Sequence, residues 1–216
     1  MRYSTYRGHS RQAGFTLVEM ATVLVIVGLL LGMAFKGKDL IDGARVKSIY
    51  ASSSKIQTAM QVFFERYQAY PGDGCSSAAK TPAECVGDAS NPKDGLILGE
   101  AEASQFWSML IQNSRLLAAA DQKMPGGVLW AVAKGEDGKG GTAAGSSWLV
   151  AQGLDEKVVD IRYVCALDQQ FDDGDPTTGE IRSSATGTKD SPTGYSADAD
   201  CWSKSGSAAL SIRLLP

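Results

Sequence analysis

The 216-residue sequence is poor in the residues and motifs on which most enzymes depend. It has one histidine, His9, and no two cysteines spaced as Cys-x-x-Cys. A nucleophile elbow, a phosphate-binding loop and a paired zinc motif are also missing, and the Ser, Asp and Glu residues have no diagnostic spacing. We therefore expect no catalytic residue and predict that the chain is not an enzyme.

The sequence also lacks an excess of positive charge. Its 21 Lys and Arg residues are outnumbered by 24 Asp and Glu residues, which gives a formal net charge of −3. Arg2, Arg7 and Arg11 all precede Gly14, so the chain beyond Gly14 carries −3 − 3 = −6. An acidic body repels the phosphates of nucleic acids, and we expect no nucleic-acid partner.

A 21-residue run from Phe15 to Phe35 is apolar apart from Thr16, Glu19 and Thr22. As a helix it would measure about 31 Å, close to the hydrocarbon thickness of a bilayer. No Ala-x-Ala cleavage site follows the run, as an ordinary secretory signal requires, so we expect the run to be retained. The arginines before it predict a cytoplasmic N-terminus and a body across the membrane.

Four cysteines lie far beyond this run: Cys75, Cys85, Cys165 and Cys201. Their even number indicates an oxidising compartment, which agrees with a body outside the cytoplasm. Four cysteines allow three pairings, and proximity in sequence favours Cys75 with Cys85 and Cys165 with Cys201. Metal binding is the alternative, but the spacing does not resemble a zinc site.

Glu19 is the exception within the apolar run, because a carboxylate in a lipid-facing helix costs several kcal/mol unless it is neutralised or paired. If the peptide bond after Gly14 is cut, Phe15 gains a free α-amino group one helical turn before Glu19. Pairing of Glu19 with the Phe15 amine of a neighbouring copy would fix the axial register of helices whose apolar sides otherwise slide. We state this as a hypothesis for assembly.

The start of the run reads Arg11-Gln12-Ala13-Gly14-Phe15-Thr16-Leu17-Val18-Glu19-Met20. This segment resembles the processing motif of type IV prepilins and type II secretion pseudopilins. The resemblance implies that a prepilin peptidase cuts between Gly14 and Phe15 and N-methylates Phe15. It also implies a single-pass protein of the bacterial inner membrane with a periplasmic C-terminus. Its further partners would be other pilin or pseudopilin subunits and an inner-membrane assembly platform.

We expect an α+β, type IV pilin-like fold, in which a long N-terminal helix packs on an antiparallel β-sheet head with disulfides. The predicted parts are a cleaved leader (1–14), the membrane half of the helix (15–36), its amphipathic half (37–70) and the head (71–216). The amphipathic half has an apolar stripe, Ile49, Ile56, Met60, Phe63 and Tyr67, and the cluster Tyr70-Pro71-Gly72-Asp73-Gly74 ends the helix.

Within the head, a second helix is predicted over residues 100–113, where Phe106, Met109, Leu110 and Asn113 have helical spacing. The strand candidates are residues 128–133, 147–151, 158–164 and 208–214, separated by glycine-rich turns. The segment 158–164 is compatible with a helix as well. An antiparallel sheet follows from this order.

The run from Asp172 to Glu180 is acidic, and Asp172, Asp173 and Asp175 are weak candidates for Ca²⁺ ligands because Ca²⁺ takes six to eight oxygens. Their spacing does not match an EF-hand. The alternative is that these carboxylates cap backbone amides in a turn. Apart from this calcium candidate, no cofactor is expected.

One departure concerns Lys36, where many major pilins carry a helix-breaking proline. Its absence, with the chain's size, favours a minor pilin over a major one. A type II secretion pseudopilin is the alternative within the family. An unassembled, membrane-anchored periplasmic binding domain is the alternative from another class.

Overall fold

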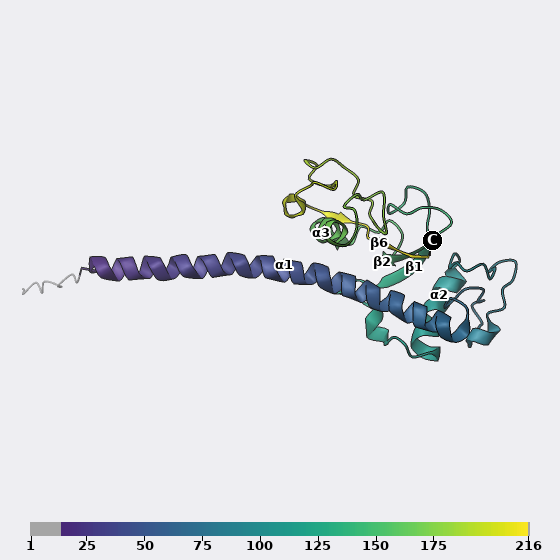
Figure 1. Cartoon of the computed structure of the whole chain (residues 1–216). Coiled ribbons are helices and arrows are strands. Elements are labelled where there is room, and N and C mark those ends of the chain that lie inside the picture. Colours follow the sequence, from purple (N-terminus) through teal and green to yellow (C-terminus); the bar gives the residue numbers. More distant parts are fainter. Residues whose placement is uncertain (1–13, 216) are drawn as a thin grey trace, which may run out of the picture. The chain divides into compact units, whose positions relative to one another are not determined.

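The computed structural model describes residues 14–215, which divide between Ile41 and Asp42 into two compact units. Helix α1, Leu17–Tyr67, begins in the first unit and ends in the second (Figure 1). The first proline of the sequence is Pro71, so every residue of α1 has a free backbone amide for helical hydrogen bonding. The helix ends where Gln68 adopts a left-handed conformation (φ 53°), just before Tyr70-Pro71. This helix, expected from sequence, is confirmed.

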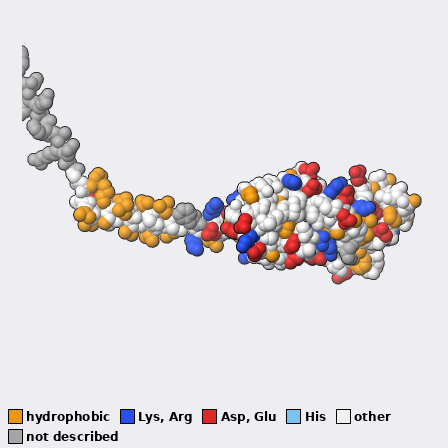
Figure 2. Space-filling model, turned by 90° about the horizontal axis from the view of Figure 1, so that it is seen from above, with side chains coloured by type: hydrophobic (Ala, Val, Ile, Leu, Met, Phe, Trp, Pro, Cys, Tyr) orange, Lys and Arg blue, Asp and Glu red, His pale blue; other side chains and the backbone are white. Residues whose placement is uncertain are grey.

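The first unit contains the apolar part of α1. The side chains of residues 14–33 are exposed, including Phe15 at 77% and Leu17 at 87%. Figure 2 shows hydrophobic side chains along this segment. It is the one helix of the described residues that is long and apolar enough to cross a membrane. Exposed apolar surface of this extent is typical of a segment that contacts a membrane or other protein chains.

The second unit buries the predicted stripe of α1. Ile49, Ile56, Met60 and Phe63 are buried, whereas Tyr67 lies at the margin and packs its ring 4.5 Å from Phe63. Two polar contacts tie this part of α1 to the sheet. Ser52 Oγ accepts a hydrogen bond from the Trp130 indole (2.9 Å), and Gln57 Nε2 donates to the Arg213 carbonyl (3.1 Å).

The main sheet is antiparallel and has the strand order β1-β2-β6-β4. Its strands are β1 Trp130–Lys134, β2 Ser147–Ala151, β4 Ile181–Arg182 and β6 Ser211–Leu215. Every residue of β2 is buried, because this strand is central and covered on both faces. In register, Leu149 pairs with Val132 on one side and with Ile212 on the other. The α+β fold with an antiparallel sheet is confirmed.

Two short strands form a second pair, β3 Val159–Asp160 with β5 Ser207–Ala208. Of the two readings of 158–164, the strand is therefore right for Val159 and Asp160, and the helix is right from Ile161, where the chain continues as helix α3, Ile161–Phe171. Asp160 causes the change, because its carboxylate accepts a hydrogen bond from the Arg162 amide and caps the helix (3.0 Å). The strand expected over 208–214 is divided between β5 and β6.

The remaining helices lie around the sheet. The predicted second helix is present as α2, Glu100–Ser108, continued by a π-helical turn, Met109–Asn113. Short 3-10 turns are η1 Pro82–Glu84, η3 Ala119–Gln122 and η4 Cys201–Ser203. Within the second unit, α3 contacts the part of α1 around Arg45, whose guanidinium donates a hydrogen bond to the Tyr163 hydroxyl. The loop around Cys85 lies near the end of α1.

Candidate functional site

The N-terminus of α1 is closed by a reciprocal pair of residues. Glu19 Oε2 accepts hydrogen bonds from the backbone amide (3.2 Å) and the hydroxyl (3.1 Å) of Thr16, and the Glu19 amide donates to Thr16 Oγ1 (3.2 Å). This is a capping box, which satisfies amides that the first turn leaves free. The carboxylate also lies where the helix dipole favours negative charge. This role of Thr16 was not expected from the sequence, although the Thr-x-x-Glu spacing is typical of a capping box.

Gly14 and Phe15, the predicted cleavage residues, directly precede this cap and are exposed. A Cβ atom placed on Gly14 would meet nothing within 4 Å. The described fold therefore gives no reason for glycine at this position. The same holds for Gly28, Gly32 and Gly37, whose missing side chains leave open space along the apolar segment.

The loop after α3 uses its carboxylates on its own backbone. Asp172 Oδ2 accepts from the amides of Glu180 (2.5 Å) and Ile181 (2.6 Å). Asp173 accepts from Thr178 Oγ1 (2.5 Å) and the Asp175 amide (2.9 Å), and the Thr178 bond lowers the pKa of Asp173. Glycine is favoured at position 179, because its φ of +72° is left-handed and a Cβ atom would meet the Asp172 carboxylate that these hydrogen bonds hold in place. These contacts match the turn-capping alternative.

A third carboxylate that the sequence analysis missed, Asp168, lies beside this loop. Asp168, Asp172 and Asp173 each offer an oxygen atom within 4.8 Å of the others, whereas the predicted Asp175 is not in this group. Asp168 is fully buried and accepts from the Tyr195 hydroxyl (2.8 Å) and the Gly174 amide (2.8 Å). Burial raises its pKa to about 7. In the described part of the chain, the oxygens of these three carboxylates lie close enough together to hold a cation.

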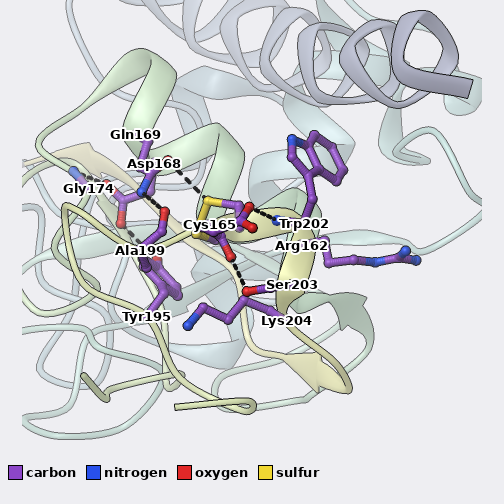
Figure 3. Close-up of a disulfide and its surroundings, with 12 residues drawn as sticks. Arg162, Cys165, Asp168, Gln169, Gly174, Tyr195, Ala199, Trp202, Ser203 and Lys204 are labelled. Atoms are coloured by element: carbon purple, nitrogen blue, oxygen red, sulfur yellow. Dashed lines mark hydrogen bonds between the residues drawn. A yellow bond between two sulfur atoms is a disulfide. The ribbon is translucent and has the colours of Figure 1, made fainter. Parts of the chain in front are cut away.

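Two disulfides hold the head, and they join the pairs that proximity in sequence favours. Cys165 of α3 is bonded to Cys201 of η4 (Figure 3). Around this bond, Gln169 donates to the carbonyls of Ala197 (3.0 Å) and Ala199 (2.9 Å). The irregular segment that carries Cys201 is thereby fastened to α3.

The second disulfide, Cys75–Cys85, closes the loop after α1. Two buried carboxylates organise its surroundings. Asp73 accepts from the amides of Asp94 and Gly95, and Glu102 of α2 accepts from those of Gly74, Leu98 and Gly99. Burial raises the pKa of Asp73. Gly72 allows the close approach, since its φ is +92° and a Cβ atom would lie 2.4 Å from the Glu102 carbonyl oxygen. The Pro-Gly-Asp-Gly cluster thus joins α1 to α2.

Comparison with known proteins identifies the N-terminal segment. Residues 9–35 match the family described as prokaryotic N-terminal methylation motif. No curated protein and no solved structure matches the chain. The match includes Gly14, Phe15, Glu19 and the exposed apolar part of α1, and it ends before the head begins.

Proposed function

We propose that this chain is a structural subunit of a type IV pilus or related filament, with the character of a minor pilin. Its N-terminal methylation motif supports a subunit of the type IV pilin or pseudopilin kind. The observation that carries the proposal is the order of features at the N-terminus. A methylation motif, a capped helix start bearing Glu19, and an apolar helical segment that no other described residue covers follow one another directly. The motif and this single apolar helix fit a single-pass membrane-anchored protein.

Processing would create the group that Glu19 needs. Cleavage between Gly14 and Phe15 leaves a cationic amine on Phe15, which the peptidase then methylates. The exposed Glu19 side chain uses only Oε2 in the capping box among the described contacts, so Oε1 is accessible to an amine of a second copy. Such a pair offsets adjacent helices by four residues, or about 6 Å along the axis. It would also neutralise two charges that are costly in an apolar environment.

The topology in this proposal places the leader in the cytoplasm and the head in the periplasm before assembly. Arg2, Arg7 and Arg11 before the apolar run support this orientation by the positive-inside rule. The two disulfides support it independently, because disulfides persist in oxidising compartments. The partners would be prepilin peptidase, other pilin subunits and an assembly platform in the inner membrane.

Mass spectrometry of the N-terminus tests the proposal. Membrane-extracted wild-type protein is expected to begin with N-methylated Phe15, and Gly14→Ala is expected to abolish this product. Gly28→Ala is the matched control, because it makes the same change at another exposed glycine of the motif region. An N-terminus still at Met1, in cells that process other prepilins, would refute the proposal and leave an unassembled anchored domain. Loss of protein export rather than of surface pili on gene deletion would identify a secretion pseudopilin.

A further inference from the structure

The head carries a hollow of about 430 Å³ beside β4, an edge strand of the main sheet. Four segments that are separate in the sequence line it: the loop between β1 and β2, the loop between β2 and β3, the turn before β4, and β4 with the residues after it. All four belong to the second compact unit. The volume lies in the range of sites that hold small ligands. We call it the polar hollow and define it by six of its lining residues: Asp137, Thr142, Asp155, Lys157, Arg182 and Ser183.

Close contacts fix the backbone along one wall of the polar hollow. Gly141 has a left-handed φ of +75°, and a Cβ atom on it would lie 2.6 Å from the Ser183 carbonyl oxygen. The loop between β1 and β2 therefore packs directly against the chain that follows β4. Thr142 is buried, and its Oγ1 accepts a hydrogen bond from the Glu136 amide (3.0 Å). This wall is formed without a ligand, which lowers the entropic cost of binding one.

Arg182 is positioned at the polar hollow by three partners. Its guanidinium lies over the buried ring of Trp148, 5.3 Å from the ring centre. Nε donates to the Gly179 carbonyl (3.0 Å), and Nη1 donates to the Gly141 carbonyl (3.5 Å). Nη2 has no hydrogen-bond partner in residues 14–215. The two N–H groups of Nη2 are therefore held in place and available to a ligand.

Asp155 and Lys157 present two further unpaired groups at the same hollow. Asp155 has a φ of 61°, in the left-handed region where a residue other than glycine is uncommon. Both side chains are exposed, and neither forms an ion pair with another described residue. Opposite charges two positions apart thus stay separate. Unusual backbone that holds an unpaired carboxylate at a cavity is characteristic of a functional position.

The charges of the polar hollow balance. Its lining carries two carboxylates and two cations, a net charge of 2 − 2 = 0: Asp137, Asp155, Lys157 and Arg182. The adjacent Lys139 forms an ion pair with Glu136 and so adds no net charge. An anion would meet both carboxylates, and a cation would meet both basic groups, so neither kind of ligand gains from all four. The balance favours a neutral ligand.

We infer that the polar hollow binds a neutral saccharide. Each saccharide hydroxyl can donate to a carboxylate and accept from an N–H group at once, which is the mixture of groups that the hollow offers. Hydrogen bonds in which one partner is charged are also the stronger kind. A zwitterionic amino acid is the competing ligand with no net charge. It has one carboxylate and one ammonium group, so it leaves half of the charged groups without a partner.

Saturation-transfer NMR on the full chain tests the inference. The chain is held in deuterated dodecylphosphocholine, because a glycoside detergent would itself present a saccharide. The probes are neutral trisaccharides of glucose, of galactose and of N-acetylglucosamine, with glycine as the zwitterion. We expect saturation transfer to the ring protons of at least one trisaccharide and none to glycine.

Variants at the rim locate the binding. Asp155→Gly removes the carboxylate and keeps a residue that adopts the left-handed conformation freely. It should weaken saccharide binding about tenfold, or about 1.4 kcal/mol, which is the scale of one hydrogen bond to a charged group. Lys157→Met should have a similar effect. Asp190→Gly, an exposed aspartate before Tyr195, is the matched control, and thermal melts verify that each variant is folded.

Three results would overturn the inference. The first is the lack of transfer to all of the trisaccharides. The second is transfer to glycine in their place, because the hollow would then recognise a zwitterion. The third is saccharide binding that both Asp155→Gly and Lys157→Met leave unchanged, which would place it elsewhere on the chain. None of these measurements depends on processing at Phe15, so each outcome leaves the filament proposal to its own test.

Discussion

The Tyr195 hydroxyl donates a hydrogen bond to Asp168 Oδ2 at 2.8 Å, and both side chains have no exposed surface. The pair links α3 to the loop between Thr186 and Cys201, which otherwise has little regular structure. Burial raises the pKa of Asp168 to about 7, more than the hydrogen bonds from Tyr195 and Gly174 lower it. The protonation state of this carboxyl group therefore couples to the stability of the head.

The sign of this coupling gives the first prediction. In the unfolded chain Asp168 has its ordinary pKa of about 3.8, so between roughly pH 4 and pH 7 the folded state binds more protons. The contribution of Asp168 is fully present below pH 4 and is lost as the pH rises toward 7. Urea unfolding in detergent should show that the free energy of unfolding falls between pH 4.5 and pH 7, and that it falls more for wild type than for Asp168→Asn. Asp190→Asn, an exposed control, should keep the wild-type difference, and parallel behaviour of all three would contradict the prediction.

The two disulfides should contribute unequally to stability. Cys165 and Cys201 are 36 residues apart and Cys75 and Cys85 are 10 apart, so loop-closure entropy gives roughly 4 and 3 kcal/mol respectively. We expect the double serine variant at Cys165 and Cys201 to have the lower free energy of unfolding, by about 1 kcal/mol. Chemical denaturation of both double variants measures this. An equal or reversed order would show that strain or residual structure dominates over loop length.

Glu19→Gln separates the two roles that Glu19 has in this chain. Glutamine also serves in a capping box, so the helix start should persist while the negative charge is lost. We expect normal cleavage and methylation at Phe15 with a strong loss of incorporation into filaments, measured by immunoblotting of sheared and cell-bound fractions. Glu65→Gln, an exposed residue in the last turns of the same helix, is the control. Wild-type incorporation of Glu19→Gln would exclude charge pairing as the assembly contact.

The acidic loop should depend on Asp172 and not on a metal ion. Its carboxylate accepts two backbone amides, so Asp172→Ala leaves both without a partner and should destabilise the head by about 1 to 3 kcal/mol. Asp172→Asn retains one acceptor oxygen and should cost less. Thermal melts with EDTA and with added CaCl₂ should coincide for the wild type. A rise in Tm with Ca²⁺ that Asp172→Ala abolishes would instead assign a cation site to Asp168, Asp172 and Asp173.

The sequence by itself determined the features that depend on neighbouring residues. Absence of proline before Pro71 and the spacing of Ile49, Ile56, Met60 and Phe63 define α1 and its buried side, because helical hydrogen bonds and apolar periodicity are local. The N-terminal motif is likewise a contiguous stretch, so the segment that processing and assembly would use was readable before any fold was known.

Tertiary structure alone decided the contacts between distant residues. Tyr163 meets Asp42 across 121 positions, and Tyr195 meets Asp168 across 27 positions. The two-residue strand β4 carries too short a pattern to be predicted and exists through its pairing with β6. The preference of a residue for helix or strand does not depend on partners that are distant in the sequence. The free energy that fixes them comes from burial and hydrogen bonding that arise only when the whole head folds.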